Sequence, residues 1–202
     1  MVTYTIKKLK TKDFTGIEKA NIDNILWGGT YKPECFAQVI YVEDEGFYAK
    51  LSCKEADPLV TYKKGDFSDD VCDDSCMEWF IDFLPGNEKG YINFEGTAAA
   101  AMNCGVGTDR NDRTPINKMI GELPTLEAGR DGEFWWVEYF LSLDVIRKVF
   151  GKINLSSGAE YRGNFYKCGE LTSDPSYLAW SFIDIPTPDY HRPDFFGKFI
   201  ME

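Results

Sequence analysis

Apolar and polar residues alternate along much of the chain, in short runs separated by glycine, proline, asparagine and aspartate. A period of two is typical of β-strands that bury one face. The pattern predicts strands at residues 37–41, 46–53, 76–83, 91–96, 134–141, 160–167 and 178–182. The small-residue run 96–107 indicates a further strand that another backbone approaches closely.

Helical spacing of apolar residues is confined to one clear stretch, residues 142–150. Ser142 is a suitable N-cap for it and Gly151 a suitable stop. A parallel α/β sheet would need a helix after nearly every strand. The sequence therefore predicts an all-β fold, a two-layer antiparallel β-sandwich with one or two short helices, formed as a single domain by residues 1–202.

Charge and hydropathy restrict the partners of the chain. It carries 22 basic and 33 acidic residues, a formal net charge of -11, which would repel nucleic acid and anionic membrane surfaces. No apolar run is long enough to span a bilayer, and no signal peptide is recognisable at the N-terminus. We expect a cytoplasmic protein, or an extracellular one if the chain is a processed fragment.

Six cysteines are too few for a disulfide scaffold in a chain of this length, and the sequence favours free, mostly buried thiols. The spacing of Cys72 and Cys76 does not match a structural zinc site. The loop 66–74 contains five aspartates. Its candidate calcium ligands are Asp69, Asp70, Asp73 and Asp74, although the order of an EF-hand is missing and a solvated acidic loop is the alternative.

The stretch 186–197, PTPDYHRPDFFG, contains the only histidine. Its prolines stiffen the loop, so that Tyr190 could stack on a sugar ring while His191 and Arg192 donate hydrogen bonds to hydroxyls. We expect this part of the loop to be exposed and residues 195–200 to plug the core. Glu78 and Lys167, on strands 76–83 and 160–167, are further candidates for polar contacts.

Signals of catalysis are weak. The chain contains no Gly-x-Ser-x-Gly nucleophile turn, no phosphate-binding loop and no dinucleotide fingerprint. No pair of carboxylates stands out as a glycosidase pair. A haem protein would need His191 together with a methionine such as Met77, Met102 or Met119 as axial ligands.

Four blocks in order resemble family 9 carbohydrate-binding modules, in particular stand-alone ones: DDSCMEWFID (73–82), NFYKCGE (164–170), YLAWSFID (177–184) and PDYHRPDFFGKFIME (188–202). The segment FWWVEYFLSLDVI (134–146) is also similar. The resemblance covers roughly residues 27–202. It implies a β-sandwich that binds a glycan end or a short oligosaccharide without catalysis, of xylan or glucan type, and that carries structural calcium ions.

The resemblance also implies site residues. The family's strand glutamate falls on Glu78, its late polar residue on or near Lys167, and its second stacking aromatic on Tyr190. The first stacking tryptophan is replaced, because Val71 and Cys72 stand at its place and Phe67 is the nearest substitute.

One further position departs from the family pattern, and one matches it. The arginine of the next strand is replaced in the neighbourhood of residues 93–95, and Trp180 matches a structural tryptophan. Two alternatives stay open: an interaction or scaffold domain with a degenerate sugar site, and part of a xylan- or glucan-degrading glycoside hydrolase such as an endoxylanase.

Overall fold

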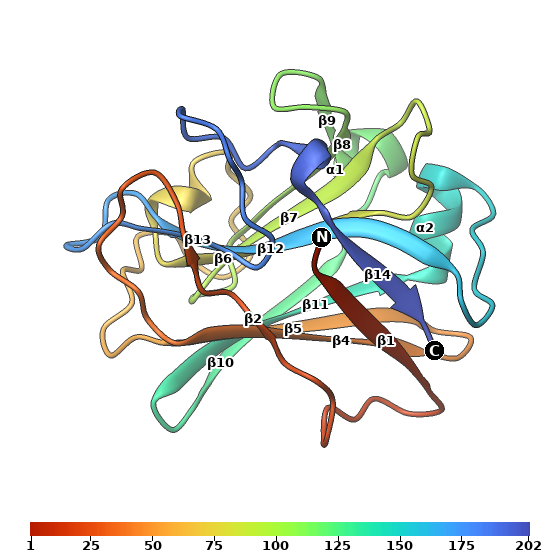
Figure 1. Ribbon diagram of the computed structural model, residues 1–202, viewed down its shortest axis with the longest axis horizontal. Helices are drawn as coiled ribbons and strands as arrows, with labels where there is room; N and C mark the ends of the chain where they lie inside the picture. Colours follow the sequence, from red (N-terminus) through yellow and green to blue (C-terminus); the bar gives the residue numbers. More distant parts are fainter.

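Two layers of β-strands form the body of the protein in a computed structural model that describes residues 1–202 (Figure 1). The strands follow one continuous hydrogen-bonded order, β10-β11-β5-β4-β1-β14-β12-β6-β7-β8-β9, which curls so that its two halves face each other. We call these halves the β5 sheet and the β6 sheet. This is the β-sandwich that the alternating sequence pattern predicts.

The β5 sheet is built of the first half of that order. Its strands are β10 (Thr125–Asp131), β11 (Phe134–Ser142), β5 (Gly46–Lys54) and β4 (Cys35–Val42), with β2 (Ala20–Asn21) added to β4. β1 (Thr3–Leu9) belongs to both halves, because its first residues pair with β14 and its last with β4. Both pairings are parallel, so the sandwich is not antiparallel throughout as expected.

The β6 sheet is built of the second half of the strand order. It consists of β14 (Gly197–Met201), β12 (Glu160–Gly169), β6 (Cys76–Asp82), β7 (Tyr91–Thr97), β8 (Met102–Gly107) and β9 (Arg113–Pro115). β13 (Ser176–Ala179) pairs with β12, and β3 (Asn24–Ile25) pairs with β13. The helical segments are α1 (Ile116–Ile120), α2 (Leu143–Phe150), η1 (Val71–Asp73) and η2 (Pro193–Phe195).

The seven predicted strands are all present within a few residues of their expected bounds, and α2 begins and ends as predicted. Ser142 Oγ accepts a hydrogen bond from the Val145 backbone N–H at 3.1 Å, and Gly151 adopts φ 80° after the last turn. The run 96–107 forms the β7–β8 turn and β8. At Gly96 an added Cβ would lie 2.5 Å from Tyr139 Oη, the close approach that the small side chain permits.

The main core fills the space between the two sheets. Met77, Trp79 and Ile81 of β6 face inward and pack against residues of the β5 sheet. Tyr139 of β11 reaches across the layers and donates a hydrogen bond to the Met77 carbonyl at 2.6 Å. Trp180 lies in this core, as the resemblance implied, and of the two adjacent tryptophans Trp135 is buried and Trp136 partly exposed.

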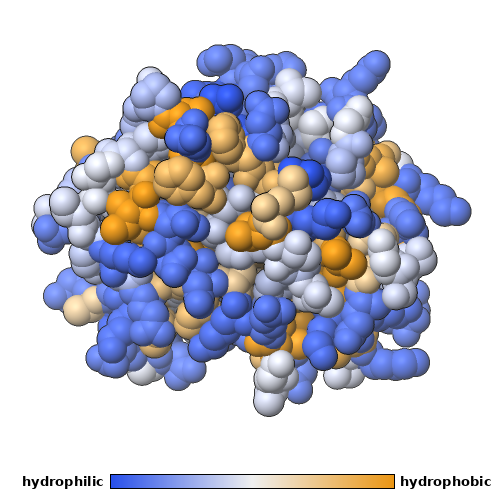
Figure 2. Space-filling model, viewed as in Figure 1, coloured by the Kyte–Doolittle hydropathy of each residue, from blue (hydrophilic) through white to orange (hydrophobic).

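A second apolar cluster lies on the outer face of the β6 sheet. Phe80, Tyr166 and Cys168 contribute to it from the strands, and Tyr190 and Phe196 cover them from the C-terminal loop. On the face seen in Figure 2, polar and charged side chains predominate and apolar ones form small separate groups. No helix has the length and apolar character needed to cross a bilayer.

Candidate binding site

Glu78 lies at the centre of the outer face of the β6 sheet because strand pairing places it between two neighbours. It is opposite Tyr166 of β12 and opposite Glu95 of β7. Side chains directly opposite each other in antiparallel strands share a face. The register thus brings two carboxyl groups and a tyrosine together, and both carboxyl groups are buried.

A small cavity opens beside this pair. It has a volume of about 60 Å³, and its walls include Glu78, Glu95, Arg113, Tyr190 and His191. A neighbouring cavity of about 210 Å³ shares three residues with it, Asp69, Arg110 and Arg113. No hydrophobic residue lines this second cavity, whose other walls are Asn103, Gly105, Asn111 and Pro115. The two cavities together form a polar recess at the β7–β8–β9 end of the sheet.

Glu95 is the most densely bonded polar group of this recess. Its Oε1 accepts hydrogen bonds from Asn93 Nδ2 at 2.8 Å and Asn103 Nδ2 at 3.3 Å, and Arg113 Nη1 lies 3.3 Å away. These partners fix the carboxyl group in one orientation. Burial raises the pKa of Glu95, while the Arg113 guanidinium acts in the opposite direction.

Glu78 has fewer partners. Its Oε1 accepts a hydrogen bond from the Cys168 thiol at 3.0 Å, and no basic side chain lies within 4 Å of it. Burial, and then the neighbouring Glu95 carboxylate, raise the pKa of Glu78 well above its usual range. Burial without a cationic partner thus disfavours the charged form of Glu78.

Tyr190 lies in the wall of the small cavity but is not the exposed platform expected for this loop. The residue is only 7% exposed. Its ring stacks on Tyr166 with centroids 4.2 Å apart, and the Trp27 ring lies 5.2 Å from it. A sugar ring needs a free aromatic face for stacking, and Tyr190 has none in this arrangement.

His191 is also buried, at 5% exposure, contrary to the expectation of an exposed loop. Its Nδ1 shares a hydrogen bond of 2.8 Å with Tyr91 Oη, and its ring lies 4.8 Å from that of Phe80. Burial and the nearby Arg113 and Arg110 lower the pKa of His191 to about 2. The ring is therefore neutral at physiological pH.

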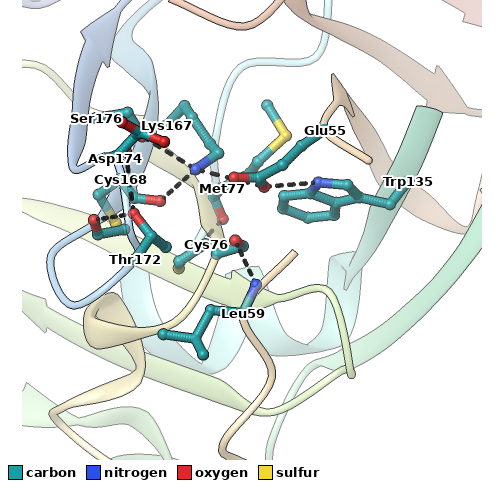
Figure 3. A network of polar contacts seen from close by, with 12 residues as sticks. Glu55, Leu59, Cys76, Met77, Trp135, Lys167, Cys168, Thr172, Asp174 and Ser176 are labelled. Carbon is teal, nitrogen blue, oxygen red and sulfur yellow. Dashed lines mark hydrogen bonds and ion pairs between the residues drawn. The ribbon is translucent and has the colours of Figure 1, made fainter. Parts of the chain in front are cut away.

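Lys167 points away from Glu78, because it neighbours Tyr166 on β12 and successive side chains alternate between faces. Its Nζ donates hydrogen bonds to the Cys168 carbonyl at 2.7 Å and Ser176 Oγ at 3.1 Å (Figure 3). Glu55 Oε2 lies 3.8 Å from the ammonium group and also accepts a hydrogen bond from Trp135 Nε1. Lys167 is thus part of a buried polar network on the inner side of the sheet and cannot serve the recess.

Two other candidates lie outside the recess. Arg192 is about one-third exposed, and its guanidinium packs over the Phe195 ring 5.6 Å away. Phe67 bridges to Met102 and packs against the main core, so it does not replace the missing tryptophan.

The four aspartates expected to bind calcium do not converge on one point. Asp74 is fully buried and accepts hydrogen bonds from the backbone N–H groups of Thr61 and Tyr62. Asp69 lines the recess, whereas Asp73 lies near Cys72 and Glu170. No cluster of three possible ligand atoms contains more than one of the four aspartates. Their arrangement does not fit a calcium ion, which takes six to eight oxygens.

The sequence alone did not indicate Glu95, Arg110 or Arg113 as part of the site. β7 (Tyr91–Thr97) contains no arginine, and the arginine that pairs with Glu95 is Arg113 of β9, two strands further along the sheet. A signal was present in the segment 107–113, GTDRNDR, where a polar turn contains Arg110 and is followed by Arg113. It could not be interpreted without knowing that β8 and β9 continue the sheet beside β7.

Comparison with known proteins places the chain in a family. The sequence model described as carbohydrate-binding family 9 matches residues 8–201. A putative carbohydrate-binding protein from Bacteroides uniformis is similar in structure, with a TM-score of 0.81, 24% identity and 99% of each chain covered.

Two further structures are of a family 9 carbohydrate-binding module from Caldicellulosiruptor kristjanssonii. The complex with glucose has a TM-score of 0.69 at 10% identity, over 100% of this chain and 96% of the other. The complex with cellotriose has a TM-score of 0.67 at 10% identity, over 100% and 94%. No curated protein sequence matches the chain significantly. Since the family's sequence model spans nearly the whole sequence, the chain belongs to carbohydrate-binding family 9.

Proposed function

We propose that the chain binds carbohydrate without catalysis, and that its ligand site is the polar recess around Glu95 and Arg113. The observation that carries this proposal is the hydrogen-bonded set of Glu95, Asn103 and Arg113 at the walls of the recess, with the fully buried Asn93 as a further donor to Glu95. Fixed carboxyl, amide and guanidinium groups match the alternating donors and acceptors of sugar hydroxyls. Family membership and the glucose and cellotriose complexes of a structural neighbour support the same ligand class.

Ligand size follows from the dimensions of the recess. Its two cavities, about 60 and 210 Å³, are smaller than the roughly 300–1,000 Å³ typical of pockets for drug-sized ligands. The recess is therefore suited to one terminal sugar unit, with the remaining glycan outside. This agrees with recognition of glycan ends or short oligosaccharides.

Hydrogen bonds, more than stacking on Tyr190, carry the proposed recognition. Tyr190 shapes the wall of the small cavity, and Arg110, which pairs with Asp189 at 3.0 Å, joins the β8–β9 turn to the C-terminal loop at the rim. Hydrogen bonds to a sugar replace hydrogen bonds to water, so each contributes little net free energy. We expect micromolar or weaker affinity.

Calcium has no assigned place in this proposal, because the candidate aspartates do not form one site. A structural calcium ion would have to be held by other oxygens of the chain. Binding of sugar to the recess needs no metal for charge balance, since Arg113 already faces Glu95.

Calorimetric titration with glucose, cellobiose, cellotriose and xylobiose tests the proposal. We expect heat of binding from at least one of these sugars with the wild type, and loss of it in Arg113→Ala and Glu95→Gln. Lys12→Ala, which removes an exposed ion pair with Glu138 on the other sheet, is the matched control and should bind normally. Equal binding by Arg113→Ala and the wild type would reject the recess as the ligand site.

A further inference from the structure

Two cysteines that lie 92 positions apart in the sequence are brought face to face beneath the recess. Cys76 of β6 is directly opposite Cys168 of β12, two residues along from the pair formed by Glu78 and Tyr166. Cys76, Glu78 and Cys168 all point to the outer side of the sheet, and all three are buried. Their two sulfur atoms and a Glu78 carboxyl oxygen lie within 4.8 Å of one another.

We propose that Cys76, Glu78 and Cys168 form a binding site for a thiophilic divalent cation of the Zn²⁺ class. Two thiolates and one carboxylate are a donor set that such ions accept, and Ca²⁺ and Mg²⁺ do not. Three protein ligands leave one tetrahedral position for water or another small ligand. This site goes beyond carbohydrate binding and does not depend on it.

Access to the three ligands supports this assignment. Glu78 and Cys168 both line the small cavity, so an ion can reach them from the recess without unfolding the sheet. Cys76 is fully buried and does not line the cavity, so it is the innermost of the three. Cys72 lines the same cavity at the end of the loop above, where it could approach a bound ion.

The partners of Glu78 provide a second, independent indication. This buried carboxyl has the Cys168 thiol as its hydrogen-bond partner and no basic side chain in ion-pair distance, unlike Glu95, which has Arg113. An unpaired carboxylate is costly to bury. A cation bound between Glu78 and the two sulfur atoms would supply the missing positive charge.

Binding of the cation releases protons from its three ligands. Each thiol loses its proton to become a thiolate ligand, and Glu78 loses one if it is protonated, so one divalent ion replaces up to three protons. No electron transfer is involved. The resulting site carries one net negative charge, and Arg110 and Arg113 in the wall of the cavity lie near enough to offset it.

Sequence spacing alone could not reveal this arrangement. Cys72 and Cys76 are close in sequence but lack a zinc-binding spacing, and the actual partner of Cys76 comes from a strand near the C-terminus. The other thiol pair of the sheets, Cys35 opposite Cys53, belongs to no such group of metal ligands. That pair therefore serves as a control.

Titration of the full chain with Co²⁺, after removal of metals by a chelator and reduction by a phosphine without oxygen, tests the proposal. We expect an ultraviolet sulfur-to-cobalt charge-transfer band and visible bands of tetrahedral Co²⁺ at one equivalent, both bleached by Zn²⁺. Cys76→Ala and Cys168→Ala should weaken Co²⁺ binding by more than the roughly 10–100-fold seen when a group outside the ligand shell is lost. Glu78→Gln should keep a weaker band.

Two control variants, Cys104→Ala and Cys35→Ala, should bind Co²⁺ like the wild type, because both remove a buried thiol outside the site. Circular dichroism of each variant verifies folding, and Glu78→Gln keeps the test valid if a cysteine variant does not fold. Absence of the charge-transfer band in reduced wild type would overturn the proposal. A band retained in both Cys76→Ala and Cys168→Ala would also overturn it. So would a count of four titratable thiols in the purified, denatured chain in place of six, because two cysteines would then be joined in a disulfide.

Discussion

Tyr190 stacks on Tyr166 with ring centroids 4.2 Å apart and planes inclined by 14°. Two hydrogen bonds of 3.0 Å reinforce the pair, from Tyr190 Oη to the Lys167 carbonyl and from Tyr166 Oη to the Tyr190 carbonyl. The stack fastens the C-terminal loop to β12. The stack therefore gives a structural role to Tyr190, which stands at the position of the family's second stacking aromatic.

The stack predicts a large loss of stability in Tyr190→Ala. Truncation of a buried aromatic side chain costs about 3–5 kcal/mol. Tyr190→Phe keeps the ring and loses one hydrogen bond, so it should cost about 1 kcal/mol. Urea unfolding followed by tryptophan fluorescence measures both values. Unchanged stability in Tyr190→Ala would mean that the tyrosine is free for a ligand after all.

The position of Lys167 on the inner face of β12 predicts that its substitution lowers stability and leaves ligand binding unchanged. Lys167→Met leaves the Glu55 carboxylate buried without its cation, which should destabilise the fold by about 3–5 kcal/mol. Carbohydrate affinity should stay unchanged, because the Lys167 side chain lies on the other face of β12 from Glu78. The double variant Lys167→Met/Glu55→Leu should recover part of the stability. Loss of sugar binding in a folded Lys167→Met protein would place the lysine in the site.

The raised pKa of Glu78 predicts that the effect of Glu78→Gln on stability depends on pH. Because the folded state raises the pKa of Glu78, it holds this proton at pH values where the unfolded chain has lost it. Stability therefore falls as the pH rises above the unfolded pKa of about 4.3. Glu78→Gln removes this cost, and its urea midpoint at pH 7–8 should exceed that of the wild type. The difference should vanish near pH 4, and a difference independent of pH would contradict this account of Glu78.

The lowered pKa of His191 predicts a pH dependence of stability with the opposite sign to that of Glu78. Its pKa is lowered to about 2, so between about pH 6.5 and 2 the unfolded chain binds a proton that the folded chain does not. Stability should fall as the pH drops, by about 3 kcal/mol from pH 7 to pH 4 on this group alone. His191→Gln should show a smaller fall over the same range. Equal pH dependence in both proteins would show that the ring is accessible to protons in the folded state.

Much of the fold could be predicted from the sequence, because the alternation of β11 is regular, that of β6 is recognisable though imperfect, and α2 has a clear cap. The alternation also placed Tyr166 and Lys167 on opposite faces of β12. The pattern could not give the register between strands or which strands are neighbours. These decide that Glu78 lies opposite Tyr166 and Glu95, and therefore that Lys167 is turned away from it.

The loop at 186–197 shows a second limit of prediction from sequence. Prolines, aromatics and a histidine are equally suited to an exposed binding loop and to a loop packed over a sheet. The apolar cluster on the outer face of β6 and β12 favours the packed arrangement, since it buries Tyr190 and His191. This cluster combines residues from segments spread between Leu26 and Phe196, and no local pattern shows it.

The location of bound sugar tests the central claim most directly. We would record backbone amide chemical shifts of the ¹⁵N-labelled chain during titration with cellotriose and glucose. A separate cavity of about 560 Å³, lined by Tyr31 and Glu55 among others, provides the control. Binding at the recess predicts the largest changes at Glu95, Asn103, Gly105 and Arg113, with little change at this separate cavity. Changes concentrated at Tyr31 and Glu55, with none at Glu95 and Arg113, would contradict the assignment of the recess as the carbohydrate site.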